Sequence, residues 1–473
     1  MSARDDLARL SLSDLLDWLE RREVSSVEAT RGCLERIDAL DEELNAFITI
    51  LADAALAEAE RADERRARGE MAPLLGAPVA LKDLFATAGI RTTGGSRLLR
   101  DNVPDTDATV TRRLREAGAV LLGKTNMMEL AYGYPHPDYG ETRNPWDAMR
   151  TARGSSGGSA AAVPAGMASA ALGSDTGGSI RSPAAYCGVV GLKPTYGAIS
   201  RSGVIPLAWS LDHAGPLTRA VRDSAILFDV LAGHDPADPA SARLAHRPAV
   251  PRLDTPAGGA RVGVVEELYQ RHVQPEVRRV TMAATERLRD AGFELVPVTL
   301  AHAHLTTAAI MPIVQAEATS YHWHDLTRRP GDFSDALREN LRLGALVLAK
   351  DYLDAQRVRR VIAGEVTAAL AGVDALIFPT QPIVAPPIGA YDVAEEGEED
   401  VLDVEIGHTG LANLSGHPAI SLPCGLTADG LPVGLQLTGR AFDEATLLRI
   451  AHQTEAALAG WDAEGIDART NVP

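Results

Sequence analysis

The spacing of apolar residues predicts that the chain begins with helices. Leucines recur at helical spacing after Ser11, and Ser25 opens a second helix with the Ser-x-x-Glu pattern of a capping box. A third helix is predicted at 52–69, where Ala, Glu and Arg dominate. We therefore expect an N-terminal helical segment over residues 1–70, followed by one larger unit over residues 71–473.

Beyond residue 70 the pattern changes to short, continuous apolar runs, which are typical of strands buried on both faces. Such runs occur at 77–81 and 119–122, and further strands are predicted at 261–265, 293–298 and 375–378. Amphipathic stretches between and after them predict helices at 107–117, 275–290, 334–371 and 443–458. Residues 159–173 are almost without polar side chains, and we expect a helix buried on most sides. Alternating strands and helices predict an α/β fold with a mixed, largely parallel central sheet, covered by helices on both faces.

Composition and charge narrow the function classes. The 473 residues carry a formal net charge of −18, which opposes binding to nucleic acids or anionic membranes. The three cysteines, Cys33, Cys187 and Cys424, lie far apart without CxxC spacing, which argues against disulfides and structural zinc. No apolar signal-peptide core follows Met1. We therefore predict a cytoplasmic protein with no nucleic-acid partner and no membrane association.

Lysine is rare in this chain, and one lysine lies at a chemically suggestive place. Lysine occurs only at positions 82, 124, 193 and 350, whereas the other 42 of the 46 basic residues are arginine. Lys82 directly follows a predicted buried strand, so burial should lower its pKa toward a value at which it can act as a base. The alternative is a structural ion pair between Lys82 and the neighbouring Asp83.

Two segments rich in glycine and serine add further candidate chemistry. Gly-Ser-Ser-Gly-Gly-Ser at 154–159 leads directly into the apolar stretch, which a flexible linker would not do. Gly-Ser-Asp-Thr-Gly-Gly-Ser-Ile-Arg at 173–181 places two glycines before a serine. Such a turn can point successive backbone N–H groups in one direction, as an oxyanion hole requires.

Together, these segments resemble the amidase signature family over roughly residues 10–460. The two glycine/serine stretches, the 24-residue separation of Ser155 and Ser179, and the upstream Lys82 all fit that family. Further matching motifs are Gly123-Lys-Thr-Asn126, Asn144-Pro145, Gly191-Leu-Lys-Pro-Thr195, Ser210-Leu-Asp-His-Ala-Gly-Pro216 and Gly430-Leu-Pro-Val-Gly-Leu-Gln436. Arg153 departs from the family, which often has glycine there.

The resemblance implies a serine hydrolase that cleaves an amide-type C–N bond through an acyl-enzyme. Ser179 would be the nucleophile, and Ser155, next to a cis peptide bond, would relay its proton to neutral Lys82. The oxyanion hole would use the backbone N–H groups of Thr176, Gly177, Gly178 and Ser179. Supporting roles would fall to Asp175, Arg181 and Ser156, and substrate contacts to Met128, Ala131 and Tyr132. The resemblance implies a small-molecule amide substrate, no cofactor and no metal, and a homodimer is possible.

Within the family, we expect a stand-alone amidase acting on a carboxylic amide, a carbamate or a urea-like substrate. The alternative is an A-type subunit that supplies ammonia to the partner subunits of a tRNA-dependent amidotransferase. Such subunits tend to have glutamine where this chain has His213, and a tyrosine-rich segment where it has residues 346–358.

Three interpretations outside the family are weaker. Residues 154–158 also satisfy G-x-S-x-G, which would make Ser156 the nucleophile of an α/β-hydrolase, but no buried strand precedes them. A phosphate-binding module would need a Walker lysine or a G-x-G-x-x-G turn, and neither is present. His322, His324 and Asp325 could suggest a metal, but they lack a further ligand at helical spacing.

Overall fold

Hydrophobic cores lie on both faces of the central sheet and organise the fold. The computed structural model describes residues 7, 9–390 and 401–459. Along strand β2 (Pro78–Lys82), Val79 and Leu81 pack into one core, whereas Ala80 packs into the other. Side chains on a strand point alternately to opposite faces, so a strand that is apolar throughout must be buried on both. This explains why the continuous apolar runs form strands.

The sheet is mixed, as the sequence predicts. Its eleven strands are ordered β1-β3-β2-β6-β8-β7-β12-β13-β11-β9-β10. Parallel pairs lie in two groups, β3-β2-β6 and β11-β9-β10, and the strands between these groups pair antiparallel. The strands other than β2 are β1 (Phe47–Ile50), β3 (Val120–Thr125), β6 (Ala170–Asp175), β7 (Val190–Lys193), β8 (His213–Thr218), β9 (Arg261–Val265), β10 (Glu294–Val298), β11 (Ala375–Pro379), β12 (Ala419–Leu426) and β13 (Pro432–Gly439), with a separate β4 (Arg143–Asn144) and β5 (Asp147–Thr151).

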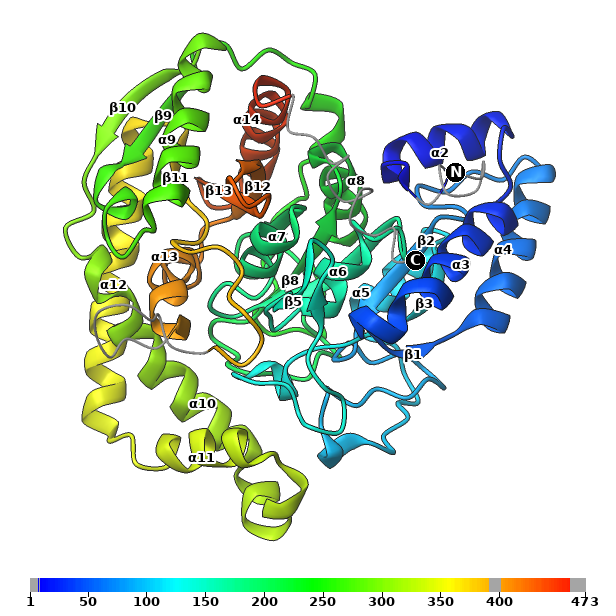
Figure 1. The fold of residues 1–473 in the computed structure, drawn as a ribbon, viewed down its shortest axis with the longest axis horizontal. Helices are drawn as coiled ribbons and strands as arrows, with labels where there is room; N and C mark the ends of the chain where they lie inside the picture. Colours follow the sequence, from blue (N-terminus) through cyan, green and yellow to red (C-terminus); the bar gives the residue numbers. More distant parts are fainter. Residues whose placement is uncertain (1–6, 8, 391–400, 460–473) are drawn as a thin grey trace.

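Helices cover both faces of this sheet, and Figure 1 shows the N-terminal ones gathered beside β2 and β3, while α10 to α12 lie at the opposite end. The helices are α2 (Leu12–Arg21), α3 (Ser26–Leu44), α4 (Ala52–Ala67), α5 (Thr109–Glu116), α6 (Gly157–Ala162), α7 (Arg181–Cys187), α8 (Val221–Leu231), α9 (Pro275–Asp290), α10 (Thr306–Arg328), α11 (Asp335–Gly344), α12 (Ala349–Gly372), α13 (Val401–Ser415) and α14 (Glu444–Ala457). No helix in the described part of the chain is both long enough and apolar enough to cross a membrane.

Two local predictions were wrong. The stretch 159–173 is not one buried helix, because α6 ends at Ala162 and strand β6 begins at Ala170. Pro164 and Gly166 lie between them, and Gly166 adopts a positive φ of 76°, which ends the helix. The N-terminal segment also contains a strand, β1, which pairs antiparallel with β3 at the edge of the sheet.

The predicted catalytic segments meet where the central strands end. Strands β2 and β6 are parallel neighbours, with Leu81 opposite Leu172, so Lys82 and Ser174 lie together at the carboxyl ends of these strands. Strand β8 runs antiparallel to β6 and begins at His213, directly opposite Asp175. In sheets of this kind, ligands bind beyond the carboxyl ends of parallel strands.

Candidate active site

Lys82 lies at the centre of a buried cluster of serine hydroxyls. Its Nζ donates to Ser155 Oγ at 2.7 Å, to Ser174 Oγ at 2.8 Å and to Ser156 Oγ at 3.0 Å. The side chain is fully buried at the end of β2. The alternative of an ion pair with Asp83 does not hold, because Asp83 contacts Lys124 instead, with 3.3 Å between Nζ and Oδ1.

This environment favours the neutral form of Lys82. Burial lowers the pKa of Lys82 well below its ordinary value, and the charges of Asp175 and Asp212 offset this only in part. Serine hydroxyls can donate as well as accept, so they can satisfy an uncharged amine. The cluster can therefore take up a proton that arrives through a serine.

Ser155 and Ser156 are adjacent in sequence but differently placed. The peptide bond between Gly154 and Ser155 is cis, and Ser155 faces a pocket that Ser179 also lines. The hydroxyl of Ser156 donates to the carbonyl of Ser174 at 3.1 Å and accepts from its N–H at 3.2 Å. Because Ser156 is bonded within the fold and does not line the pocket, the geometry disfavours it as a nucleophile.

The loop between β6 and α7 is shaped by Asp175. Its carboxylate accepts from the backbone N–H of Gly178 at 2.9 Å and of Ile180 at 3.2 Å. The predicted oxyanion hole therefore needs a correction, because the N–H of Gly178 is already engaged inside the loop. Among the described residues, none accepts a hydrogen bond from the amides of Thr176, Gly177 and Ser179.

Arg181 anchors this loop to the C-terminal part of the chain. Its guanidinium makes a fully buried, two-point ion pair with Asp175, at 2.9 and 3.0 Å, and also donates to Gln436 Oε1 at 2.7 Å. Burial alone would raise the pKa of Asp175, but the charge and hydrogen bonds of Arg181, the charge of Lys193 and a hydrogen bond from Asn413 together outweigh burial and hold that pKa below its ordinary value. Gly178 is required at its position, because it has a φ of 136° and a Cβ there would lie 2.2 Å from Thr409 Oγ1.

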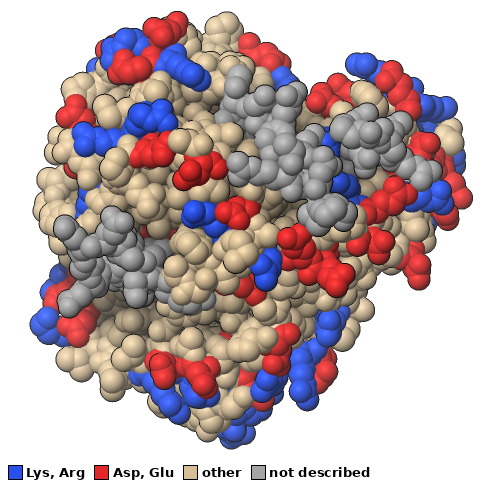
Figure 2. All heavy atoms as spheres, in the orientation of Figure 1, with Lys and Arg blue, Asp and Glu red and all other residues tan. Residues whose placement is uncertain are grey.

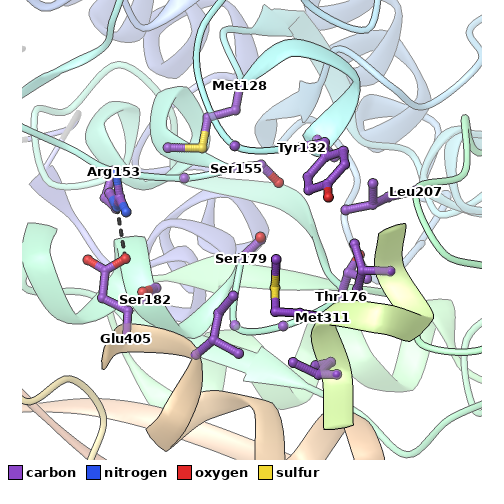
Figure 3. Close-up of a pocket in the computed structure, with 18 residues that line it drawn as sticks. Met128, Tyr132, Arg153, Ser155, Thr176, Ser179, Ser182, Leu207, Met311 and Glu405 are labelled. Atoms are coloured by element: carbon purple, nitrogen blue, oxygen red, sulfur yellow. Dashed lines mark hydrogen bonds and ion pairs between the residues drawn. The ribbon is translucent and has the colours of Figure 1, made fainter. Parts of the chain in front are cut away.

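The pocket in front of Ser179 is mostly apolar, with a charged pair on one side (Figure 3). It is lined by Met128, Ala131, Tyr132, Gly133, Arg153, Gly154, Ser155, Thr176, Gly177, Gly178, Ser179, Ser182, Leu207, Ile310, Met311, Val314, Glu405 and Ile406. The structure thus brings the three predicted substrate-contact residues, Met128, Ala131 and Tyr132, to the same pocket as Ser155 and Ser179.

Arg153, at a position where the family often has glycine, forms a buried ion pair in the structure. Arg153 has a φ of 60°, in the left-handed region that favours glycine, and its Nε donates to Glu405 Oε2 at 2.8 Å. Glu405 also accepts from the hydroxyl of Tyr186 at 2.6 Å. The sequence pattern did not reveal Glu405 and Leu207 as pocket residues, because they come from distant segments that carry no local motif.

The remaining candidates lie away from the pocket. His213 is buried between strands, where its Nε2 lies 3.2 Å from Lys193 Nζ. His322 and His324 lie on α10, and in the described part of the chain no group of three or more His, Cys, Asp or Glu side chains is placed to hold a metal ion.

A mixed α/β sheet that carries a buried lysine–serine cluster beside a glycine-rich loop agrees with the fold and the motifs expected of the amidase signature family. The family described as Amidase matches residues 28–448, so the chain belongs to the amidase family and is an enzyme that hydrolyses amide C–N bonds.

Individual relatives agree over nearly the full chain. The A-type subunit of the glutamyl-tRNA(Gln) amidotransferase of Geobacter metallireducens is 42% identical, over 96% of this chain and 98% of that protein. The structure of the corresponding protein from Thermotoga maritima is 35% identical, with a TM-score of 0.79 and 94% of both chains covered. A chain solved in work on a vestigial protein complex and the origins of an s-triazine catabolic enzyme is 38% identical, with a TM-score of 0.89, covering 94% of this chain and 98% of that one.

These relatives correct one prediction and shift another. The expectation of no nucleic-acid partner is contradicted, because curated relatives are subunits of an enzyme named for its tRNA. Net charge is a sum over the whole chain and does not describe how the charges are distributed, and Figure 2 shows acidic and basic side chains interspersed on one face. It therefore does not exclude contact with tRNA through an assembly. The relatives also favour the A-type subunit over the stand-alone amidase.

Proposed function

We propose that this chain is the A-type subunit of a tRNA-dependent amidotransferase, in which it hydrolyses a small primary amide and releases ammonia for partner subunits. The observation that carries the proposal is the agreement with a curated A-type subunit over 96% of this chain and 98% of that protein. Such a reaction belongs in the cytoplasm, where aminoacyl-tRNA is made, and this location is part of the proposal.

In the proposed reaction, Ser179 Oγ attacks the scissile carbonyl carbon while its proton passes through Ser155 to neutral Lys82. The amides of Thr176, Gly177 and Ser179 stabilise the negative oxygen of the tetrahedral intermediate. The C–N bond then breaks as Lys82 returns the proton through Ser155 to the nitrogen, which leaves as ammonia. Water attacks the acyl-Ser179 ester by the same relay and releases the carboxylic acid.

Each proposed role has support in the geometry. Lys82 donates a hydrogen bond to Ser155, and it is buried among hydroxyl groups that can also form hydrogen bonds with its neutral form. Ser155 and Ser179 face the same pocket. Asp175 and Arg181 hold the loop that carries Ser179, which supports the positioning roles proposed for them.

The decisive experiment uses the chain assembled with the partner subunits of its own host. We expect the complex to amidate Glu-tRNA(Gln) with L-glutamine as the nitrogen source. The Ser179→Ala complex should lose this activity with glutamine and regain it with ammonium chloride, because only ammonia release has been removed. Failure of ammonium to restore the variant, or the absence of any complex, would count against the proposal.

A stand-alone amidase is the second candidate, and the apolar lining of the pocket favours it. Seven of the side chains around Ser179 are hydrocarbon or thioether, namely Met128, Ala131, Leu207, Ile310, Met311, Val314 and Ile406. If the isolated chain hydrolyses hydrocarbon amides as fast as the assembled chain hydrolyses glutamine, this second candidate is correct.

A further inference from the structure

Tyr132 carries a buried hydroxyl that the fold does not use. It directly follows the short helical turn Glu129–Ala131, and only 4% of the residue is exposed. Among the described residues, no group forms a hydrogen bond with its phenol oxygen. Burying a hydroxyl without a partner costs folding free energy, so a group of this kind is expected to have a partner outside the fold.

The position of Tyr132 indicates what that partner is. Tyr132 lines the pocket together with Ser155 and Ser179. Figure 3 shows its phenol beside Leu207, on the side of the pocket opposite Arg153. Burial raises the pKa of the phenol above its usual value, so the group remains a neutral donor near neutral pH. A molecule bound at Ser179 would lie within the same space as this donor.

We propose that Tyr132 determines substrate specificity, because its phenol O–H donates a hydrogen bond to an acceptor oxygen in the acyl part of the substrate. This inference rests on the proposed function, in which the leaving group is ammonia. Any acceptor beyond the scissile amide must then belong to the acyl part. The substrate class is a short primary amide with a carbonyl or carboxylate oxygen a few atoms from the scissile carbon.

The physical basis is the asymmetry between a satisfied and an unsatisfied donor. A substrate with a suitable oxygen completes the hydrogen bond, whereas a hydrocarbon amide of the same length leaves the phenol unpaired in an apolar wall. Sites built around a buried polar group reject analogues that lack its partner much more strongly than apolar sites reject a missing methylene. Tyr132 would therefore select against hydrocarbon amides that otherwise suit this pocket.

The test compares wild type and Tyr132→Phe on two matched pairs of primary amides. Succinamate and glutaramate carry a terminal carboxylate, and butanamide and pentanamide are hydrocarbon amides of the same lengths. Wild type should prefer an acid of at least one pair. In Tyr132→Phe, kcat/KM should fall about tenfold or more on that acid and less than about twofold on its hydrocarbon partner.

Stability gives an independent readout and a matched control. Removing an unpaired buried hydroxyl leaves no partner behind, so Tyr132→Phe should keep or raise Tm. Tyr269 is also buried, but its hydroxyl is bonded to Thr285 Oγ1 at 2.8 Å, away from the pocket. Tyr269→Phe should lower Tm and leave both rates unchanged. If Tyr132 served folding alone, Tyr132→Phe would instead lower Tm and leave both rates unchanged.

Two results would overturn the inference. One is an equal loss on both members of each pair, which would place the hydrogen bond on the scissile amide itself. The other is an undiminished preference for the acid in Tyr132→Phe.

If wild type turns over none of the four amides, the proposed release of ammonia from small amides fails separately. Binding to the unreactive Ser179→Ala variant, measured as a shift in Tm, then tests the inference. The shift caused by the acid should disappear when Tyr132→Phe is added, and its persistence would contradict the proposal.

Discussion

Two buried lysines on neighbouring parallel strands have opposite surroundings. Lys82 ends β2 and Lys124 lies on β3, opposite Leu81. Lys82 contacts three serine hydroxyls, whereas Lys124 donates to the carbonyl of Phe85 at 2.8 Å and to Thr92 Oγ1 at 2.7 Å, and lies 3.3 Å from the carboxylate of Asp83. The two lysines are therefore almost equally buried, but their hydrogen-bond and ion-pair partners differ.

The partners decide what each lysine can do. Burial lowers the pKa of both, but Asp83 opposes this at Lys124 through direct contact, whereas the carboxylates that act on Lys82 do not touch it. A carboxylate favours the charged form of its partner, and a carbonyl can only accept. Lys124 is therefore suited to a structural ion pair, and Lys82 to gaining and losing a proton.

The largest expected effect is the loss of the base. Lys82→Arg keeps a positive charge that cannot be removed near neutral pH, so we expect kcat/KM to fall about 10³-fold or more. Initial rates measure this, with circular dichroism and Tm to check folding. Lys124→Arg is the matched control and should keep activity within about tenfold of wild type. Comparable losses in both variants would erase the distinction between the two lysines.

The next effect is structural. Lys124→Met leaves the buried carboxyl of Asp83 without its charged partner, so the free energy of unfolding in urea should fall by about 3–5 kcal/mol. Adding Asp83→Asn should recover most of this, because the uncompensated charge is gone. If the double variant is as unstable as the single one, Lys124 does not stabilise the fold through its ion pair with Asp83.

The pH dependence sharpens the comparison. Since activity requires neutral Lys82, kcat/KM should rise about tenfold per pH unit until the lowered pKa of Lys82 is reached. Between that pKa and 10.5 the unfolded chain binds more protons than the folded chain, so stability also rises with pH there. Lys82→Met should remove this contribution. An activity optimum near pH 5 would contradict the assignment of Lys82 as the base.

The smallest expected effect concerns Asp212, whose carboxylate accepts from Thr176 Oγ1 at 2.6 Å. Burial raises the pKa of Asp212 to about 6, against partial opposition from its hydrogen bonds and Arg201. A carboxyl with a raised pKa contributes stability below about pH 4 that is lost as pH rises through 6, here about 2–3 kcal/mol. The stability difference between Asp212→Asn and wild type should change over this range, as measured by urea unfolding at each pH. A constant difference would show that Asp212 does not titrate there.

Much of the fold could be predicted from the sequence because its signals are local. The strand predicted at 261–265 and the helix predicted at 275–290, which begins at a proline, have the bounds of β9 and α9. The stretch 159–173 misled because apolar residues without a polar face suit a buried helix and a buried strand equally. Strand β1 has four residues and pairs with a strand more than 70 positions later, which no local pattern reveals.

The site divides in the same way. Lys82, Ser155 and Ser179 each lie in a short sequence motif, so the resemblance is enough to predict that these three residues lie close together. The engagement of the Gly178 amide by Asp175 depends on the loop's path, and the pairing of Arg153 with Glu405 joins residues 252 positions apart. These contacts depend on tertiary packing and could not be predicted from spacing.

Covalent labelling of the nucleophile tests the central claim most directly. The protein would be treated with a fluorophosphonate, which phosphonylates activated serines, and the adduct located by peptide mass spectrometry. The account predicts a single adduct on Ser179, formed rapidly by wild type and Lys124→Arg and at least about 100-fold more slowly by Lys82→Arg. An adduct on Ser155 or Ser156, or equal labelling rates with and without Lys82, would contradict the assignment of Ser179 and Lys82.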